Sequence, residues 1–180
     1  DAQESRGLGD VYKRQVHGID VSPAAIGIAR DRIAHENAGI PAPAPDLRVG
    51  NFSRLPWPDA HFDVAVDIFA LYANTKDVIR ATLSEIARVL KPGALFYSKL
   101  WGTGCTGYGL GRQLEPGTFD DIPGGPCKGM GVSHFFTREE IGPLFGTWFD
   151  ATAIDTVQRT DVAANQRIEE FHCQFTRAAR

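Results

Sequence analysis

Asp20, Asn51 and Asp67 each stand at or just after the end of a short apolar run, and their types suit ligand binding. A carboxylate such as Asp20 can accept hydrogen bonds from both hydroxyls of a vicinal diol. The Asn51 amide can accept from or donate to the edge of a heterocyclic base, and the neighbouring Phe52 can lie against its ring. In an open parallel sheet, ligands bind at the carboxyl ends of strands. Together these residues predict a nucleoside site, with Asp20 and Asn51 meeting at neighbouring strand ends.

The elements that must position these residues follow a strand and helix pattern. Ser22 suits a helix N-cap and Pro23 the first helical position, where no N–H is needed. The run at 75–91 carries apolar residues at helical spacing and ends at Lys91-Pro92-Gly93. Long crossovers of this kind favour a mainly parallel α/β sheet. We expect strands over 16–21, 47–49, 62–67 and 94–100, the third of them buried, and helices from Ser22 to the stop at 37–39 and over 75–91.

The second half of the chain breaks this pattern. Ten of the 19 glycines lie within 101–132, which predicts a long, mobile, substrate-side loop. Thr137 and Glu140 form a capping box that opens a short helix. Strands at 151–157 and 168–175 are expected to form an antiparallel pair at one edge of the sheet.

The first fifteen residues differ from the rest in composition. They are polar and lack a hydrophobic period, and SRGLGDVYKRQ is similar to a translated sequencing-adapter scar. We therefore expect 1–15 to be a non-native or disordered leader and 16–180 to be the domain.

Composition excludes several classes. The chain has 43% hydrophobic and 23% charged residues, which is ordinary for a globular domain. Its net charge of -3 gives no basic footprint for nucleic acid, and no apolar run is long enough to cross a membrane. Cys105, Cys127 and Cys173 are too scattered for a metal site and fit a reducing cytoplasm. We expect no metal, nucleic-acid or membrane partner.

Four segments in order resemble the class I S-adenosylmethionine-dependent methyltransferases, in particular the type 11-like branch that acts on small molecules. VHGIDVSPAAIGIAR is similar to the family's second strand and following helix, and GNFSRLPWPDAHFDVAVD to its third and fourth strands. LSEIARVLKPGALFYS is similar to the helix and turn before the fifth strand, and HFFTREEI to a late helix. The resemblance implies a Rossmann-like, doubly wound, mostly parallel sheet with an antiparallel edge strand.

The resemblance also implies roles for individual residues. S-adenosyl-L-methionine is the expected cofactor, with Asp20 on its ribose, Asn51 on the adenine amino group and Phe52 against the ring. Asp67 and Ile68 are expected to line the cleft near the transferred methyl group. The family usually has Asp at the position of Asn51, so the uncharged amide predicts weaker affinity.

One family segment has no counterpart in this sequence. The acidic, glycine-rich segment of the first strand lies upstream of Val16 in the family, and RGLGD at 6–10 does not reproduce it. We therefore expect this chain to be a fragment whose parent supplied the first strand and the glycine-rich loop. That strand is central in the family's sheet, so its loss is expected to leave two open strand edges.

Methyl transfer to a hydroxyl or carbon acid needs a base, whereas a nitrogen or thiol acceptor needs little help. Candidate bases are His134, after the glycine-rich loop, and Tyr72, after the strand at 62–67. Tyr97, Tyr108 and His172 are further candidates, and packing roles compete for all of these residues. Trp101, Tyr108 and Phe119 suit a lid over an aromatic or apolar acceptor.

Two other functions stay open at this point. A nicotinamide-dependent dehydrogenase also places an acidic residue after its second strand, although LPWPDAHFDVAVD fits the methyltransferase pattern better. A catalytically inactive, methyltransferase-like binding or scaffold domain would keep the fold without the reaction.

Overall fold

A computed structural model describes residues 15–36 and 43–179 of the chain. The chain divides into two compact units, with the boundary between Leu55 and Pro56. The expected leader, except for Gln15, and the expected helix stop at 37–39 lie outside the described residues.

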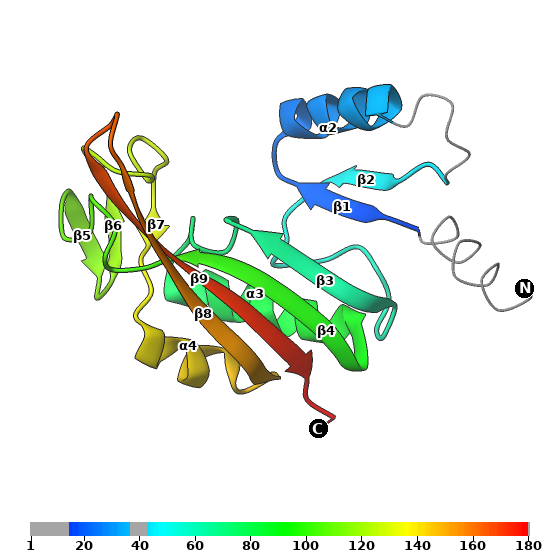
Figure 1. The fold of residues 1–180 in the computed structure, drawn as a ribbon. Coiled ribbons are helices and arrows are strands. Elements are labelled where there is room, and N and C mark those ends of the chain that lie inside the picture. The colour runs from blue at the N-terminus through cyan, green and yellow to red at the C-terminus, as the bar shows by residue number, and fades with distance from the viewer. Residues whose placement is uncertain (1–14, 37–42, 180) are drawn as a thin grey trace, which may run out of the picture. The chain divides into compact units, whose positions relative to one another are not determined.

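The first unit is a strand, helix, strand arrangement, as the sequence predicts. It consists of β1 (His17–Asp20), α2 (Pro23–Glu36) and β2 (Asp46–Val49), and the two strands pair in parallel with Asp20 opposite Val49 (Figure 1). Ser22 caps α2, because its Oγ accepts from the backbone N–H of Ala25 at 3.2 Å. Pro23 is the first helical residue, which confirms the sequence-based start of this helix.

The second unit is built on a four-stranded mixed sheet. Its order is β3-β4-β9-β8, with β3 and β4 parallel and β9 antiparallel to both of its neighbours. The elements are β3 (Phe62–Ile68), α3 (Lys76–Val89), β4 (Leu90–Trp101), α4 (Arg138–Phe145), β8 (Phe149–Asp161) and β9 (Gln166–Arg177). The parallel pair and the antiparallel hairpin are therefore confirmed. Only β8 of that hairpin lies at the edge.

Helices α3 and α4 pack on one face of this sheet and form its core (Figure 1). Phe145 of α4 stacks on Phe175 of β9 with ring centroids 4.7 Å apart, and Phe96 of β4 lies 6.4 Å from Phe145. From α3, Ile79 and Leu83 are fully buried. Aromatic pairs of this kind stabilise a core beyond the burial of their area alone.

The opposite face of the sheet corrects one expectation. The sequence predicts that the strand at 62–67 is buried, yet Val64, Val66 and Ile68 are 53%, 63% and 52% exposed. The reason is that β3 is the edge strand of its sheet, pairing with β4 alone among the described strands. Since α3 and α4 lie on the other face, alternate residues of β3 face away from the core. We call this second face the open face.

The glycine-rich segment also differs from its prediction as a structureless loop. It holds β5 (Arg112–Glu115) and β6 (Thr118–Asp120), which form a three-stranded antiparallel sheet with β7 (Ser133–His134). Pro116 and Gly117 connect β5 to β6, and Gly117 has φ of 85°, which is typical of the third position of a type II turn.

Candidate functional site

The two residues expected to hold a nucleoside lie at the same edge of the first unit's sheet. Asp20 is the last residue of β1, and Asn51 follows β2 by two residues. The N–H of Gly50 donates to the carbonyl of Asp20 at 2.9 Å, so the pairing of the two strands continues up to this edge. The geometry therefore brings the carboxyl ends of both strands together, as parallel pairing requires.

Within the part of the chain that the structure describes, each of these side chains keeps one hydrogen-bonding group unused. The Oδ1 atom of Asp20 accepts from the N–H of Ser22 at 2.7 Å, and no described residue bonds Oδ2. The Oδ1 atom of Asn51 accepts twice from Ser53, from its N–H and its hydroxyl, both at 2.9 Å. Its lone pairs are therefore used within an Asx turn, and Nδ2 is the group left to donate. Phe52 beside it is partly exposed.

Asp67 and Ile68 end β3 in the second unit and point to opposite faces of the sheet. Asp67 is 8% exposed and accepts from the N–H groups of Ala70 and Leu71 and from the hydroxyl of Ser98 at 2.6 Å. Burial raises the pKa of this carboxyl, although the three hydrogen bonds oppose the shift. Asp67 thus fixes the turn that follows β3, while Ile68 is exposed on the open face.

An aromatic cluster follows this turn. Phe69, with φ of 56°, stacks on Trp101 at the end of β4 with ring centroids 3.9 Å apart and planes 11° apart. The Tyr72 ring meets both of them edge-on, at 6.5 and 6.2 Å. Tyr72 is only 7% exposed, and burial raises the pKa of its hydroxyl, which makes it a poorer base at neutral pH.

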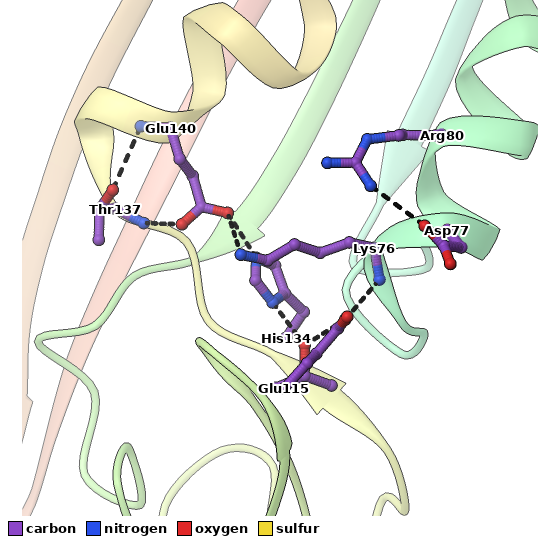
Figure 2. A network of polar contacts seen from close by, with 8 residues as sticks. Lys76, Asp77, Arg80, Glu115, His134, Thr137 and Glu140 are labelled. Carbon is purple, nitrogen blue, oxygen red and sulfur yellow. Dashed lines mark hydrogen bonds and ion pairs between the residues drawn. The ribbon is translucent and has the colours of Figure 1, made fainter.

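His134 is completely buried at the centre of a polar network (Figure 2). Its Nδ1 lies 2.8 Å from the hydroxyl of Thr118 on β6, and its Nε2 lies 2.6 Å from Glu140 on α4. The Thr118 hydroxyl also donates to Glu115 at 2.9 Å. Gly117 makes room for the ring, since a Cβ there would lie 2.8 Å from its Cε1 atom.

Lys76 joins the same network, with its Nζ 3.8 Å from Glu140. Glu140 therefore contacts both Nε2 of His134 and the Lys76 ammonium. Glu115 accepts from the Thr118 hydroxyl, which itself contacts Nδ1 of the ring.

Glu115 and Glu140 tie this network to two helices. Glu115 accepts from the N–H of Lys76 at 2.7 Å, in the first turn of α3, whose N-cap Thr75 makes no side-chain cap bond. Glu140 completes the capping box with Thr137, which confirms the predicted start of α4. Burial alone would raise the pKa of each glutamate. The bonds from Lys76 and Thr118 to Glu115, and from His134 to Glu140, outweigh burial and lower both values.

The structure therefore places His134, expected as a candidate base, where both ring nitrogens already have partners inside the protein. Sequence reasoning did not single out Thr118 or Glu115 as its partners. The E-P-G-T turn at 115–118 carried a local signal for the hairpin, but nothing local links it to His134. Within the described residues, no three His, Cys, Asp or Glu side chains gather in a way that could hold a metal ion.

Comparison with known proteins identifies the family. Residues 3–93 match the family model described as a methyltransferase domain. The chain is 36% identical over 87 residues to the ubiquinone/menaquinone biosynthesis C-methyltransferase UbiE of Laribacter hongkongensis, covering 46% of this chain and 32% of that protein. It thus spans about a third of the length of the curated relatives it matches.

Solved structures share its fold. An S-adenosylmethionine-dependent methyltransferase from Methanosarcina mazei superposes with a TM-score of 0.68 at 24% identity, covering 92% of this chain and 83% of that one. A 1,6-didemethyltoxoflavin-N1-methyltransferase from Burkholderia thailandensis, solved with bound 1,6-didemethyltoxoflavin and S-adenosylhomocysteine, gives a TM-score of 0.62 at 17% identity, covering 92% of this chain and 62% of that one. The Rossmann-like α/β fold expected from the sequence is confirmed. Among the described helices, none combines the length and apolarity that a membrane span requires.

Proposed function

The chain belongs to the class I S-adenosylmethionine-dependent methyltransferases, and we propose that it transfers a methyl group from S-adenosylmethionine to a small-molecule acceptor. The single observation that carries the proposal is the edge formed by the paired parallel strands β1 and β2, where Asp20 ends β1 and Asn51 follows β2. The UbiE relative acts, by its name, in ubiquinone/menaquinone biosynthesis, and the Burkholderia thailandensis enzyme is, by its name, a methyltransferase of 1,6-didemethyltoxoflavin. A net charge of -3 supports a small molecule rather than a nucleic acid as acceptor.

The groups left unused at this edge fit the nucleoside part of the cofactor. Oδ2 of Asp20 can accept from a ribose hydroxyl, and Nδ2 of Asn51 can donate to a ring nitrogen of adenine. The partly exposed Phe52 can cover the ring. In this proposal Asn51 donates to the base, whereas the sequence resemblance had it accepting from the adenine amino group. When bound, the sulfonium supplies an electrophilic methyl group.

In the second unit, we assign Ile68 to the acceptor side and Asp67 to the support of its turn. Ile68 is exposed at the carboxyl end of β3, and Asp67 is held by three internal hydrogen bonds. The stacked Phe69 and Trp101 lie next along the chain and on the adjacent strand. His134 and Tyr72 are too deeply enclosed to meet an acceptor directly.

We place the protein in the cytoplasm. All three of its cysteines, Cys105, Cys127 and Cys173, are free and buried. Burial raises the pKa of each thiol, that of Cys127 and Cys173 to about 12, so none is poised for exchange. Such thiols fit a reducing compartment.

Isothermal titration with S-adenosylhomocysteine tests the proposal. Asp20→Asn keeps an oxygen for the N–H of Ser22 and removes the charge, so we expect binding to weaken about 10- to 100-fold. Asp31→Asn, a matched change on the exposed surface of α2, is the control and leaves the affinity unchanged. Equal binding by the Asp20 and Asp31 variants would contradict the proposed site. Binding without methyl transfer to any small acceptor would favour the scaffold alternative.

A further inference from the structure

Glu170 is a buried carboxylate that gathers three basic side chains on the open face of the second unit. It lies on β9, is 7% exposed, and has His172 Nε2 at 2.9 Å, Arg159 Nη2 at 3.4 Å and Lys99 Nζ at 3.8 Å. Burial alone would raise its pKa, but the bonds from His172 and Arg159 and the charge of Lys99 lower it. Glu170 is therefore ionised at neutral pH and can only accept hydrogen bonds.

This fixes the tautomer of His172. Because an ionised carboxylate donates nothing, Nε2 of His172 must carry the proton in the 2.9 Å bond. In the neutral ring, Nδ1 then holds the free lone pair. No described residue hydrogen-bonds Nδ1, and the side chain is 25% exposed. The pair has the form of a general base oriented by a carboxylate.

The strand register places this pair level with the end of β3. Ile68 pairs with Lys99 on β4, Lys99 with His172 on β9, and His172 with Asp155 on β8. These four residues form one row across the open face, because directly paired residues share a face. Asp67, one residue earlier, bonds Ser98 on the covered face, which agrees with this alternation.

The surroundings of His172 favour an aromatic hydroxyl as its partner. Lys99 Nζ lies 5.8 Å from the centre of the Phe69 ring, which itself stacks on Trp101. An ammonium beside an aromatic surface can attract the negative charge that grows on an ionising hydroxyl. The other charged or titratable groups facing His172 are Tyr97 of β4, with its ring centroid 6.3 Å away, Asp155, and Arg159 beyond Glu170.

We propose that His172 is the catalytic base for methyl transfer to a phenolic acceptor, with Glu170 as its positioning residue; this inference rests on the proposed function. The acceptor O–H bond breaks, and its proton passes to Nδ1 of His172. The oxygen uses its electron pair to bond the methyl group, and the pair of the broken sulfur–methyl bond stays on sulfur. The products are a methyl ether and S-adenosylhomocysteine.

The first test reads the imidazole directly and needs no turnover. Nitrogen NMR of the histidine side chains of the full chain, recorded at a pH at which the His172 ring is neutral, is expected to show the proton on Nε2 and the lone pair on Nδ1. In Glu170→Gln the tautomer is no longer fixed, and the Nδ1–H form becomes populated. A neutral wild-type ring with its proton on Nδ1 overturns the proposal.

The second test separates acceptors that need a base from those that do not. Transfer of a labelled methyl group from S-adenosylmethionine is measured with phenol and with thiophenol, since a thiol ionises readily by itself. We expect His172→Gln to lose about 100- to 10,000-fold with phenol and to recover as the pH rises, while thiophenol methylation stays within about threefold. His35→Gln, an exposed histidine at the end of α2, leaves both rates unchanged.

The outcomes distinguish this inference from the proposed function. Equal losses with both acceptors, or no loss with phenol, overturn the role of His172 and leave methyl transfer standing. A wild-type chain that methylates thiophenol but not phenol also overturns the role of His172 and leaves methyl transfer standing. A chain that does not bind S-adenosylhomocysteine overturns the proposed function, and this inference with it.

Discussion

The second unit holds two histidine–glutamate pairs, His134–Glu140 and His172–Glu170, that use the same groups in different surroundings. His134 is fully buried with both ring nitrogens bonded, whereas His172 is a quarter exposed with one nitrogen bonded. The His134–Glu140 pair joins α4 to the hairpin of β5 and β6 and, through Glu115, to α3. The second lies on an open sheet face. The difference shows that the number of occupied nitrogens, rather than the pairing with a carboxylate, separates a structural histidine from a candidate base.

Replacing each histidine by leucine should give the largest contrast. His134→Leu removes both hydrogen bonds of a fully buried ring and leaves the partly buried Glu140 with Lys76 at 3.8 Å, so we expect the free energy of unfolding to fall by about 3–5 kcal/mol. His172→Leu is expected to change it by less than about 1 kcal/mol, because Glu170 keeps Arg159 and Lys99. Urea denaturation of both variants measures the difference. Equal destabilisation would remove the distinction between the two pairs.

Acid should weaken the His134 network through its glutamates. The folded-state pKa values of Glu115 and Glu140 are lowered, so their stabilisation is complete above the unfolded value, about 4.3. It is then lost as the pH falls through the lowered folded values. We expect the stability advantage of the wild type over Glu140→Gln to shrink steadily from about pH 6 to about pH 3. Denaturation at several pH values checks this, and a constant difference would contradict the assignment.

A smaller effect should follow from the cap that orients Glu140. Thr137→Ala removes the hydroxyl that accepts from the N–H of Glu140 at 3.2 Å, at an expected cost of about 1 kcal/mol. Thr147→Ala, at an exposed threonine after α4, is the control and should stay within about 0.5 kcal/mol. Thermal melts compare the two. If both variants have the same melting temperature, the capping box contributes nothing to the stability of the network.

Features written in neighbouring residues could be predicted from the sequence. Ser22-Pro23 and the box of Thr137 and Glu140 mark helix starts within one turn, and both are present in the structure. The parallel strands could also be predicted, because their crossovers contain long helical patterns. The positions of Asp20 and Asn51 at strand ends could be predicted, because a strand end is a local property of the chain.

Features that depend on contacts between residues far apart in the chain could not be predicted from the sequence. The strand at 62–68 has an apolar sequence, but its exposure follows from its place at the sheet edge and from helices that pack on the other face. The many glycines at 101–132 predict a loop, yet this segment holds two strands of a three-stranded sheet. The third strand of that sheet, at 133–134, lies beyond the segment. The partners of His134 lie on β6 and α4, so its burial could not be predicted from its neighbours in the sequence. Glu170 and His172, two residues apart on one strand, did carry a period-two signal that placed them on one face.

The most direct test of the central claim is NMR of the backbone amides during titration with S-adenosylhomocysteine. If Asp20 and Asn51 hold the nucleoside, the shifts concentrate at the ends of β1 and β2, at residues 20–22 and 50–53, and Asp20→Asn weakens the response. A bound nucleoside that leaves both strand ends unperturbed would contradict it.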